Sequence, residues 1–140
     1  MRAITVVVTV DDKMGIAFNK RRQSRDRCLI EDLCQSTDKD IYISPYSLPL
    51  FSEWENRVKV CDSPLSECAD GGVAFIEMTQ IGDHIGDVSE LIIYRWNKIY
   101  PSDKKLDFVP EECGFVKVST SEFTGNSHDV ITKDVYHKAI

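Results

Sequence analysis

Short apolar runs separated by polar and glycine-containing segments recur along the whole chain. Residues 3–10 are almost entirely Val, Ile and Thr, which is typical of a strand buried on both faces at the centre of a sheet. Shorter runs, some with alternating apolar and polar positions, predict further strands. These lie at residues 40–44, 57–61, 73–77, 90–96 and 115–119, and a further strand is expected at 130–136.

One segment shows helical spacing instead. Leu29 and Leu33 lie on one face of a helix, and Ser24 precedes them as a residue whose hydroxyl can accept from an exposed amide of the first turn. We therefore expect a helix over residues 25–35. Residues 45–54 contain two prolines, which favours a loop with a short helix over a strand.

Strands and helices alternate at first, whereas the last third of the chain holds strands alone. This order predicts a single α/β domain over residues 1–140, with a mostly parallel sheet, antiparallel strands at the C-terminus and short flanking helices. The segment Gly125-Asn126-Ser127-His128 is expected to be a tight hairpin turn.

The composition is that of an ordinary globular protein. Hydrophobic residues make up 42% and charged residues 29% of the 140 positions, which excludes a low-complexity chain. No apolar stretch approaches the ~18 residues of a membrane span, and the apolar start of the chain is too short for a signal peptide. The five cysteines form an odd set without a C-x-x-C pair. We therefore expect a cytosolic protein with free thiols and no membrane partner.

The net charge of −6 argues against a nucleic acid polymer as partner. The positive charge, however, is concentrated near the expected start of the helix. Five of the 17 basic residues fall within eight positions, namely Lys20, Arg21, Arg22, Arg25 and Arg27.

This basic run follows the first strand, at the edge where open α/β sheets bind ligands. Free amides at a helix start favour an anion, and guanidinium groups bind phosphate or carboxylate through two hydrogen bonds. We therefore predict a pocket for a small anionic or nucleotide-like ligand. Its predicted residues are Asn19, Arg21, Arg22, Ser24 and Arg25. The competing explanation is a solvated helix start whose arginines pair with nearby carboxylates.

Aromatic residues gather where the strand at 90–96 ends. Tyr94 and Trp96 are candidates to line the same cleft, although aromatic residues at a strand end also serve as core or rim packing. The chain lacks dinucleotide-binding and Walker glycine loops, a G-x-S-x-G elbow and paired histidines at metal-ligand spacing. The sequence therefore names no cofactor and no metal-ligand set.

The order of elements resembles dihydrofolate reductase. Residues 6–19 resemble the first strand of that family, its loop glycine (Gly15) and the following asparagine (Asn19). Residues 41–44 resemble the strand before the first phosphate-binding turn, and the C-terminal strands match in order. The resemblance implies that Asp26 lies within a residue of the position of the family's substrate-binding carboxylate.

Several motifs of that family are replaced. Residues 21–24 stand in place of Pro-Trp-x-x-Pro, and residues 44–47 in place of the Gly-Arg-x-Thr turn. Glu77 and Met78 follow the fourth strand, where the family has Gly-Gly. The connector at 61–73 is too short for the unit that supports the adenine end of NADPH. The resemblance therefore implies an inherited fold without the classical NADPH site.

Three functions stay open at this point. The first is a reductase-like domain that binds an anionic or nucleotide-like molecule, with Asp26 accepting from an N–H group of a heterocycle. The second is an active NADPH-dependent pterin or flavin reductase, with Asp26 handling the proton. The third is a metal-dependent nucleotide hydrolase, with Asp11, Asp12 and Asp26 near a divalent ion. The oligomeric state is also open, with a homodimer as one expectation.

Overall fold

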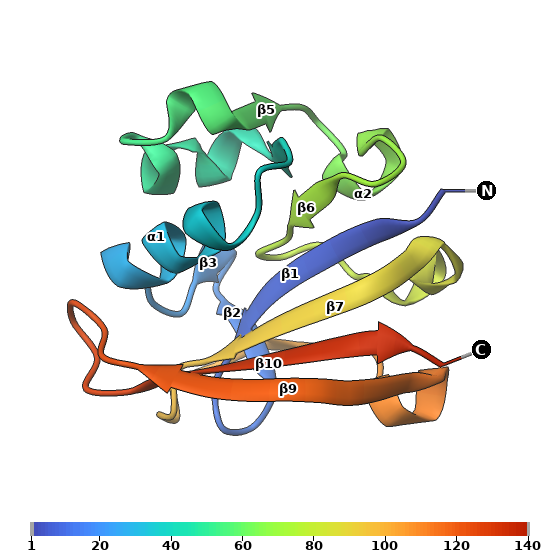
Figure 1. Cartoon of the computed structure of the whole chain (residues 1–140). Coiled ribbons are helices and arrows are strands. Elements are labelled where there is room, and N and C mark those ends of the chain that lie inside the picture. Colours follow the sequence, from blue (N-terminus) through green and yellow to red (C-terminus); the bar gives the residue numbers. More distant parts are fainter. Residues whose placement is uncertain (1, 140) are drawn as a thin grey trace.

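A seven-stranded sheet runs through the computed structural model, which describes residues 2–139 (Figure 1). The strands follow the order β5-β4-β6-β1-β7-β10-β9. Their bounds are β1 Ile4–Val10, β4 Ile41–Ile43, β5 Val58–Val60, β6 Val73–Phe75, β7 Val88–Arg95, β9 Phe115–Phe123 and β10 Ile131–Lys138. All pairings from β5 to β7 are parallel, whereas β10 runs antiparallel to both β7 and β9. The predicted mixed sheet with antiparallel C-terminal strands is confirmed.

A second, three-stranded sheet and several short helices complete the fold. The small sheet has the order β3-β2-β8, with β2 Gly15–Phe18, β3 Arg21–Arg22 and β8 Lys104–Lys105. The α-helices are α1 Arg27–Ser36 and α2 Pro64–Glu67, and the 3-10 helices are η1 Pro45–Phe51, η2 Glu55–Arg57, η3 Gly82–Asp87 and η4 Pro110–Cys113. The sequence did not predict the small sheet, because strands of two to four residues are too short to show a period.

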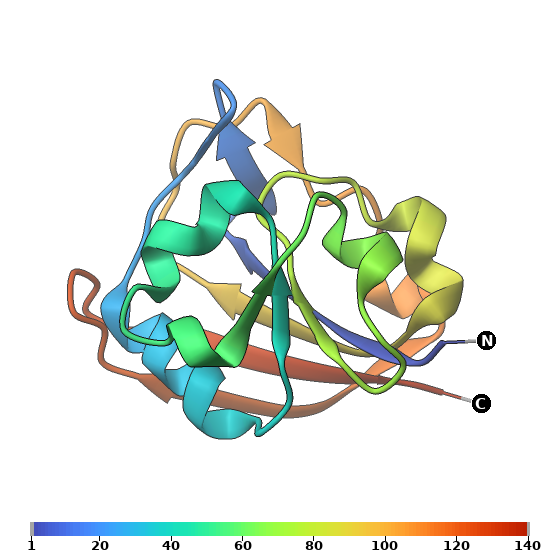
Figure 2. The same ribbon diagram turned by 90° about the horizontal axis from the view of Figure 1, so that it is seen from above.

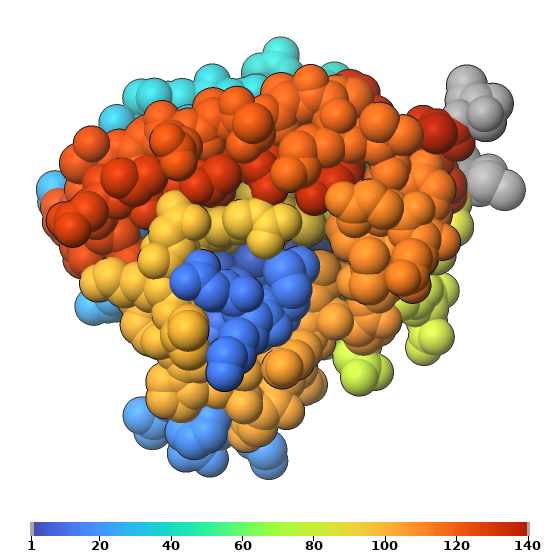
Figure 3. All heavy atoms as spheres, turned by 90° about the horizontal axis from the view of Figure 1, so that it is seen from below, coloured from blue at the N-terminus to red at the C-terminus, as the bar shows by residue number. Residues whose placement is uncertain are grey.

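The core lies on both faces of β1, as its continuous apolar run predicts. Val7 packs in one cluster with Leu29 and Leu33 of α1, whereas Val6 and Val8 belong to a second cluster that includes Tyr136. Seen from above, α1 lies across the strands on its side of the sheet (Figure 2). Seen from below, β9 and β10 form a band beside the turn that follows β1 (Figure 3).

The start of α1 differs from the prediction. Asp26, not Ser24, is the N-cap, and its carboxylate accepts a hydrogen bond from the backbone N–H of Cys28. Both residue types cap helices well, so the choice depends on tertiary contacts. The turn between β9 and β10 reaches this helix start (Figure 1). Within residues 2–139, no helix is long and apolar enough to cross a membrane.

Candidate functional site

Asp26 is the centre of a dense hydrogen-bond network at the start of α1. Its Oδ1 accepts from the backbone N–H groups of Cys28 and Asn126, at 2.9 and 2.8 Å. Its Oδ2 accepts from the backbone N–H of Ser127 at 2.8 Å and faces His128 Nδ1 at 2.9 Å. Gly125 permits this approach, because a Cβ at that position would lie 2.5 Å from Oδ2. The predicted hairpin turn is therefore also the partner of the helix cap.

The network keeps Asp26 ionised. Burial on its own raises the pKa of a carboxyl group, but hydrogen bonds from Asn126, His128, Ser127 and Cys28 outweigh it and hold the pKa of Asp26 at about 2. An ionised carboxylate can only accept hydrogen bonds. The proton between Asp26 and His128 therefore belongs to Nδ1 of the imidazole.

His128 is buried and contacts an indole ring, a carboxylate and three hydroxyl groups. Its ring stacks on Trp96, with centroids 4.5 Å apart and an angle of 24° between the planes. Its Nε2 lies 3.1 Å from Ser24 Oγ and 2.9 Å from the hydroxyl of Tyr100. In the neutral imidazole, a proton on Nδ1 leaves Nε2 to accept a hydrogen bond from one of these two hydroxyls.

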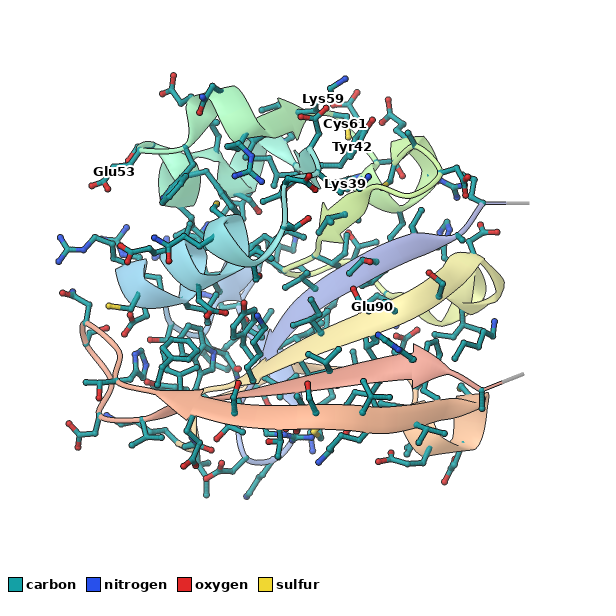
Figure 4. All side chains as sticks on the ribbon, viewed as in Figure 1. Lys39, Tyr42, Glu53, Lys59, Cys61 and Glu90 are labelled. Carbon is teal, nitrogen blue, oxygen red and sulfur yellow. The ribbon has the colours of Figure 1, made fainter. Side chains whose placement is uncertain are left out.

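A cavity of about 340 Å³ opens next to this network. It is bounded by the start of α1, the segment between η1 and η2, and the tip of the β9–β10 hairpin. Arg25, Arg27 and Glu53 supply charged groups, whereas Ile30 and Trp54 supply apolar ones. Figure 4 shows Glu53 at the end of the molecule where α1 begins. The volume is within the range of small-molecule sites, which combine apolar walls with a few polar groups.

A much smaller space of about 10 Å³ lies deeper, at the carboxyl ends of the central strands. Thr9 at the end of β1, Phe75 at the end of β6 and Trp96 after β7 line it together with Ser24. It shares Arg25 with the larger cavity, so the two spaces adjoin. Both therefore occupy the edge of the sheet at which α/β folds bind ligands.

Arg22 lines neither space, whereas its partner Glu77 lines the inner one. Its guanidinium donates two hydrogen bonds to the buried carboxylate of Glu77, at 2.7 and 3.0 Å, and lies over the ring of Tyr46. Ser47 also donates to Glu77, at 2.7 Å. Glu77 follows β6, at the position where the resemblance expects Gly-Gly. The positive charge of Arg22 is therefore already matched within the protein.

The remaining predicted site residues are not brought to the cavity. Asn19 lies in the β2–β3 turn with a φ of 52°, and Arg21 is exposed on β3. Tyr94 is fully buried, and its hydroxyl donates to Asp32. None of the three lines either space described above. Of the predicted set, Ser24, Arg25, Asp26 and Trp96 come together.

The carboxylates proposed for a metal ion are not clustered. Asp11 accepts from the backbone N–H groups of Lys13 and Gly15, so it closes its own turn. Both carboxylate oxygens of Asp26 already accept hydrogen bonds from the hairpin. Among the described residues, no group of three His, Cys, Asp or Glu side chains could hold a metal ion.

A second open cavity, of about 510 Å³, lies at the other edge of the sheet. Its lining includes Thr5 and Val73 near the amino ends of β1 and β6, with Lys39 and Glu90 (Figure 4). It is larger than the cavity at α1, but it lies at the edge of the sheet that α/β folds rarely use. The combination of guanidinium groups, an indole ring and a buried polar network favours the cavity at α1.

Two of the three comparisons with known proteins find nothing. Neither the family models nor the curated proteins include a match to this chain. Solved structures do match. Among them is a dihydrofolate reductase from Enterococcus faecalis complexed with NADP(H) and RAB-propyl, with a TM-score of 0.66. The alignment covers 96% of this chain and 95% of that chain at 10% identity. The chain therefore has a dihydrofolate reductase-like fold, as the resemblance in the order of elements implied.

Sequence reasoning identified Asp26 but missed His128. The histidine was expected only as the last residue of the Gly125-Asn126-Ser127-His128 turn. The structure buries it beside a carboxylate 102 positions earlier in the chain. A lone histidine in a Gly-Asn turn carries no local signal for such a contact, because the contact depends on where the hairpin ends.

Proposed function

We propose that this protein binds a small anionic or nucleotide-like molecule in the cavity at the start of α1. The observation that carries the proposal is the guanidinium of Arg25. It borders a cavity of about 340 Å³, and no carboxylate within residues 2–139 forms an ion pair with it. An unpaired guanidinium offers two parallel N–H donors to a phosphate or carboxylate group.

The other cavity residues define the rest of the ligand. The indole of Trp54 and the side chain of Ile30 suit a flat ring, and the carboxylate of Glu53 can accept from an amino group on it. An aromatic heterocycle with an amino group and an acidic group therefore matches the cavity. Arg27 supports one wall, because its guanidinium donates to Asn126 of the hairpin.

The same proposal disfavours classical NADPH-dependent folate reduction. Glu77 stands where the resemblance expects the Gly-Gly of the family, and its negative charge would repel the phosphate groups of NADPH. Arg22 cannot compensate without leaving Glu77. The alternative, an active NADPH-dependent pterin or flavin reductase, requires a nicotinamide bound in another way. Because the fold resembles that of a reductase complexed with NADP(H), NADPH is included among the ligands to be tested.

The test is a thermal-shift screen followed by calorimetry. The ligands are AMP, GMP, folate, NADPH and aminobenzoate, each with wild-type protein and with Arg25→Ala. We expect at least one acidic heterocycle to bind, with the affinity reduced about tenfold in Arg25→Ala because a charge-assisted hydrogen bond is lost. Arg21→Ala is the matched control, since it removes an equal charge on exposed β3.

Two outcomes would contradict the proposal. One is the absence of any ligand that stabilises the wild-type protein. The other is equal weakening by Arg21→Ala and Arg25→Ala, which would indicate a general charge effect. Consumption of NADPH, followed by its absorbance at about 340 nm, would favour the reductase instead.

A further inference from the structure

Ser24, His128 and Asp26 form a continuous hydrogen-bonded chain. Ser24 Oγ lies 3.1 Å from His128 Nε2, and His128 Nδ1 lies 2.9 Å from Asp26 Oδ2. The order of the groups is hydroxyl, imidazole and carboxylate, as in enzymes that activate a serine by general-base catalysis. We propose that Ser24 is an acyl-accepting nucleophile, and that the protein hydrolyses small carboxylic esters through it.

The hydrogen-bond directions in the network agree with this role. Because Asp26 can only accept, Nδ1 of His128 donates to it, and in the neutral imidazole Nε2 then carries the lone pair. The stack of Trp96 on the imidazole fixes the plane of the ring. The base is therefore oriented before substrate arrives, as a catalytic base must be.

A tetrahedral intermediate needs a donor for its oxyanion. The hydroxyl of Tyr100 lies 2.9 Å from Nε2 and 3.5 Å from Ser24 Oγ. When Ser24 donates its proton to Nε2, the hydroxyl of Tyr100 is released from that nitrogen and can donate to the oxyanion formed beside Ser24. The backbone N–H of Arg25, next to the nucleophile, makes no hydrogen bond within residues 2–139 and is a second candidate donor.

The reaction balances with water as the only co-reactant. Ser24 Oγ bonds to the ester carbonyl carbon while its proton passes to His128 Nε2. The carbon–oxygen bond to the alcohol then breaks, and His128 returns the proton to the leaving alcohol. Water, deprotonated in turn by His128, attacks the acyl group on Ser24, so the products are a carboxylic acid, an alcohol and free Ser24.

The space around Ser24 limits the acyl group. It measures about 10 Å³, about the room that one water molecule needs, so even an acetyl group must displace a lining side chain to enter. It adjoins the larger cavity through Arg25. An acetyl ester of an anionic alcohol therefore requires the smallest displacement at Ser24, with its alcohol part in the larger cavity. This choice of alcohol rests on the proposed ligand cavity, whereas the nucleophile itself does not.

The experiment is covalent labelling of the folded wild-type protein with a small fluorophosphonate, followed by peptide mapping. Attack by Ser24 forms an oxygen–phosphorus bond, and fluoride leaves. We expect one adduct, on Ser24, formed at least 100-fold faster than in His128→Gln and absent in Ser24→Ala. Ser121→Ala, an exposed serine on β9, is the matched control and should be labelled as the wild type is. Wild type and Ser121→Ala should hydrolyse 4-nitrophenyl acetate at the same rate. His128→Gln should be much slower, and Ser24→Ala should be inactive.

The wild-type result alone decides the matter if a variant fails to fold. No adduct on Ser24, or an adduct on another serine only, overturns the proposal. Equal labelling rates in folded His128→Gln and wild type also overturn it, because the histidine would then not activate the serine. If a ligand binds but Ser24 is not labelled, the proposed binding function stands and the nucleophile fails. If Ser24 is labelled but no ligand binds, the nucleophile stands and the proposed binding function fails.

Discussion

Arg22 and Arg25 belong to one basic run in the sequence, yet the fold gives them opposite surroundings. Arg22 is half-buried, donates twice to Glu77 and packs over Tyr46. Arg25 is exposed at the rim of a cavity and forms no ion pair within the described chain. The comparison teaches that a charge run predicts an anion site only where tertiary structure leaves a guanidinium without a carboxylate.

The largest expected effect is at Asp26, which ties the hairpin to the helix start and so shapes the open cavity. Asp26→Ala leaves three backbone N–H groups and His128 without their acceptor. We expect a loss of about 3–5 kcal/mol in the free energy of unfolding, measured by urea denaturation. Asp62→Ala, at an exposed loop residue, should change it by less than about 0.5 kcal/mol. A comparable loss in both variants would mean that the cap network contributes little.

The neutralisation of Arg22 depends on Glu77. Glu77→Leu leaves the half-buried Arg22 without its partner, so we expect a loss of about 2–3 kcal/mol. A double-mutant cycle with Arg22→Met should show a coupling of about 2 kcal/mol, since the two groups are in direct contact. The exposed pair Lys59–Asp40, at 3.6 Å, should show about 0–0.5 kcal/mol. Equal couplings would remove the distinction between a buried and a solvated arginine pair.

Acid should lower the stability of the protein by protonating Asp26, the carboxylate that joins the hairpin to the helix start next to Arg25. The pKa of Asp26 is about 2 in the folded protein against 3.8 for the free side chain, so the folded state holds fewer protons between these values. Its stabilising contribution is complete above about pH 5 and is lost as the pH falls to 2. The loss is about 2 kcal/mol. Denaturation series at several pH values should show this component in wild type and not in Asp26→Asn.

The smallest effect is expected at Arg25. Because the side chain is exposed and forms no ion pair within residues 2–139, Arg25→Ala should leave the free energy of unfolding unchanged within about 0.5 kcal/mol. Thermal unfolding followed by circular dichroism measures this difference. A clear loss of stability would show that Arg25 has a structural partner, and the contrast with Arg22 would fail.

Much of the large sheet was predictable from local pattern. The strand at 90–96 became β7 at Val88–Arg95, and the helix at 25–35 became α1 at Arg27–Ser36. These elements bury whole faces, so their apolar spacing appears directly in the sequence. β9 extends to Phe123, beyond the predicted end at residue 119. The extension was not predictable, because most of its side chains are exposed and its polar residues show no alternation.

The candidate site was predictable only in part. Arg25 was proposed because a helix start beside a central strand is a recognisable anion site, and Asp26 was proposed from the family resemblance. Tyr94 was proposed to line the cleft, but it faces the core, where its ring meets Phe123 and its hydroxyl meets Asp32. Trp96, two residues later, does line the inner space. The choice between them depends on which face of β7 the helix covers.

The sequence by itself determined the order of elements, the central position of β1 and the concentration of charge before α1. Each of these is a local property, expressed in neighbouring residues. Tertiary structure alone decided which arginine is neutralised and that His128 lies between Ser24 and Asp26. Those contacts join residues 55 and 102 positions apart, and their energy depends on distances of a few ångströms that only the packed sheet and hairpin define.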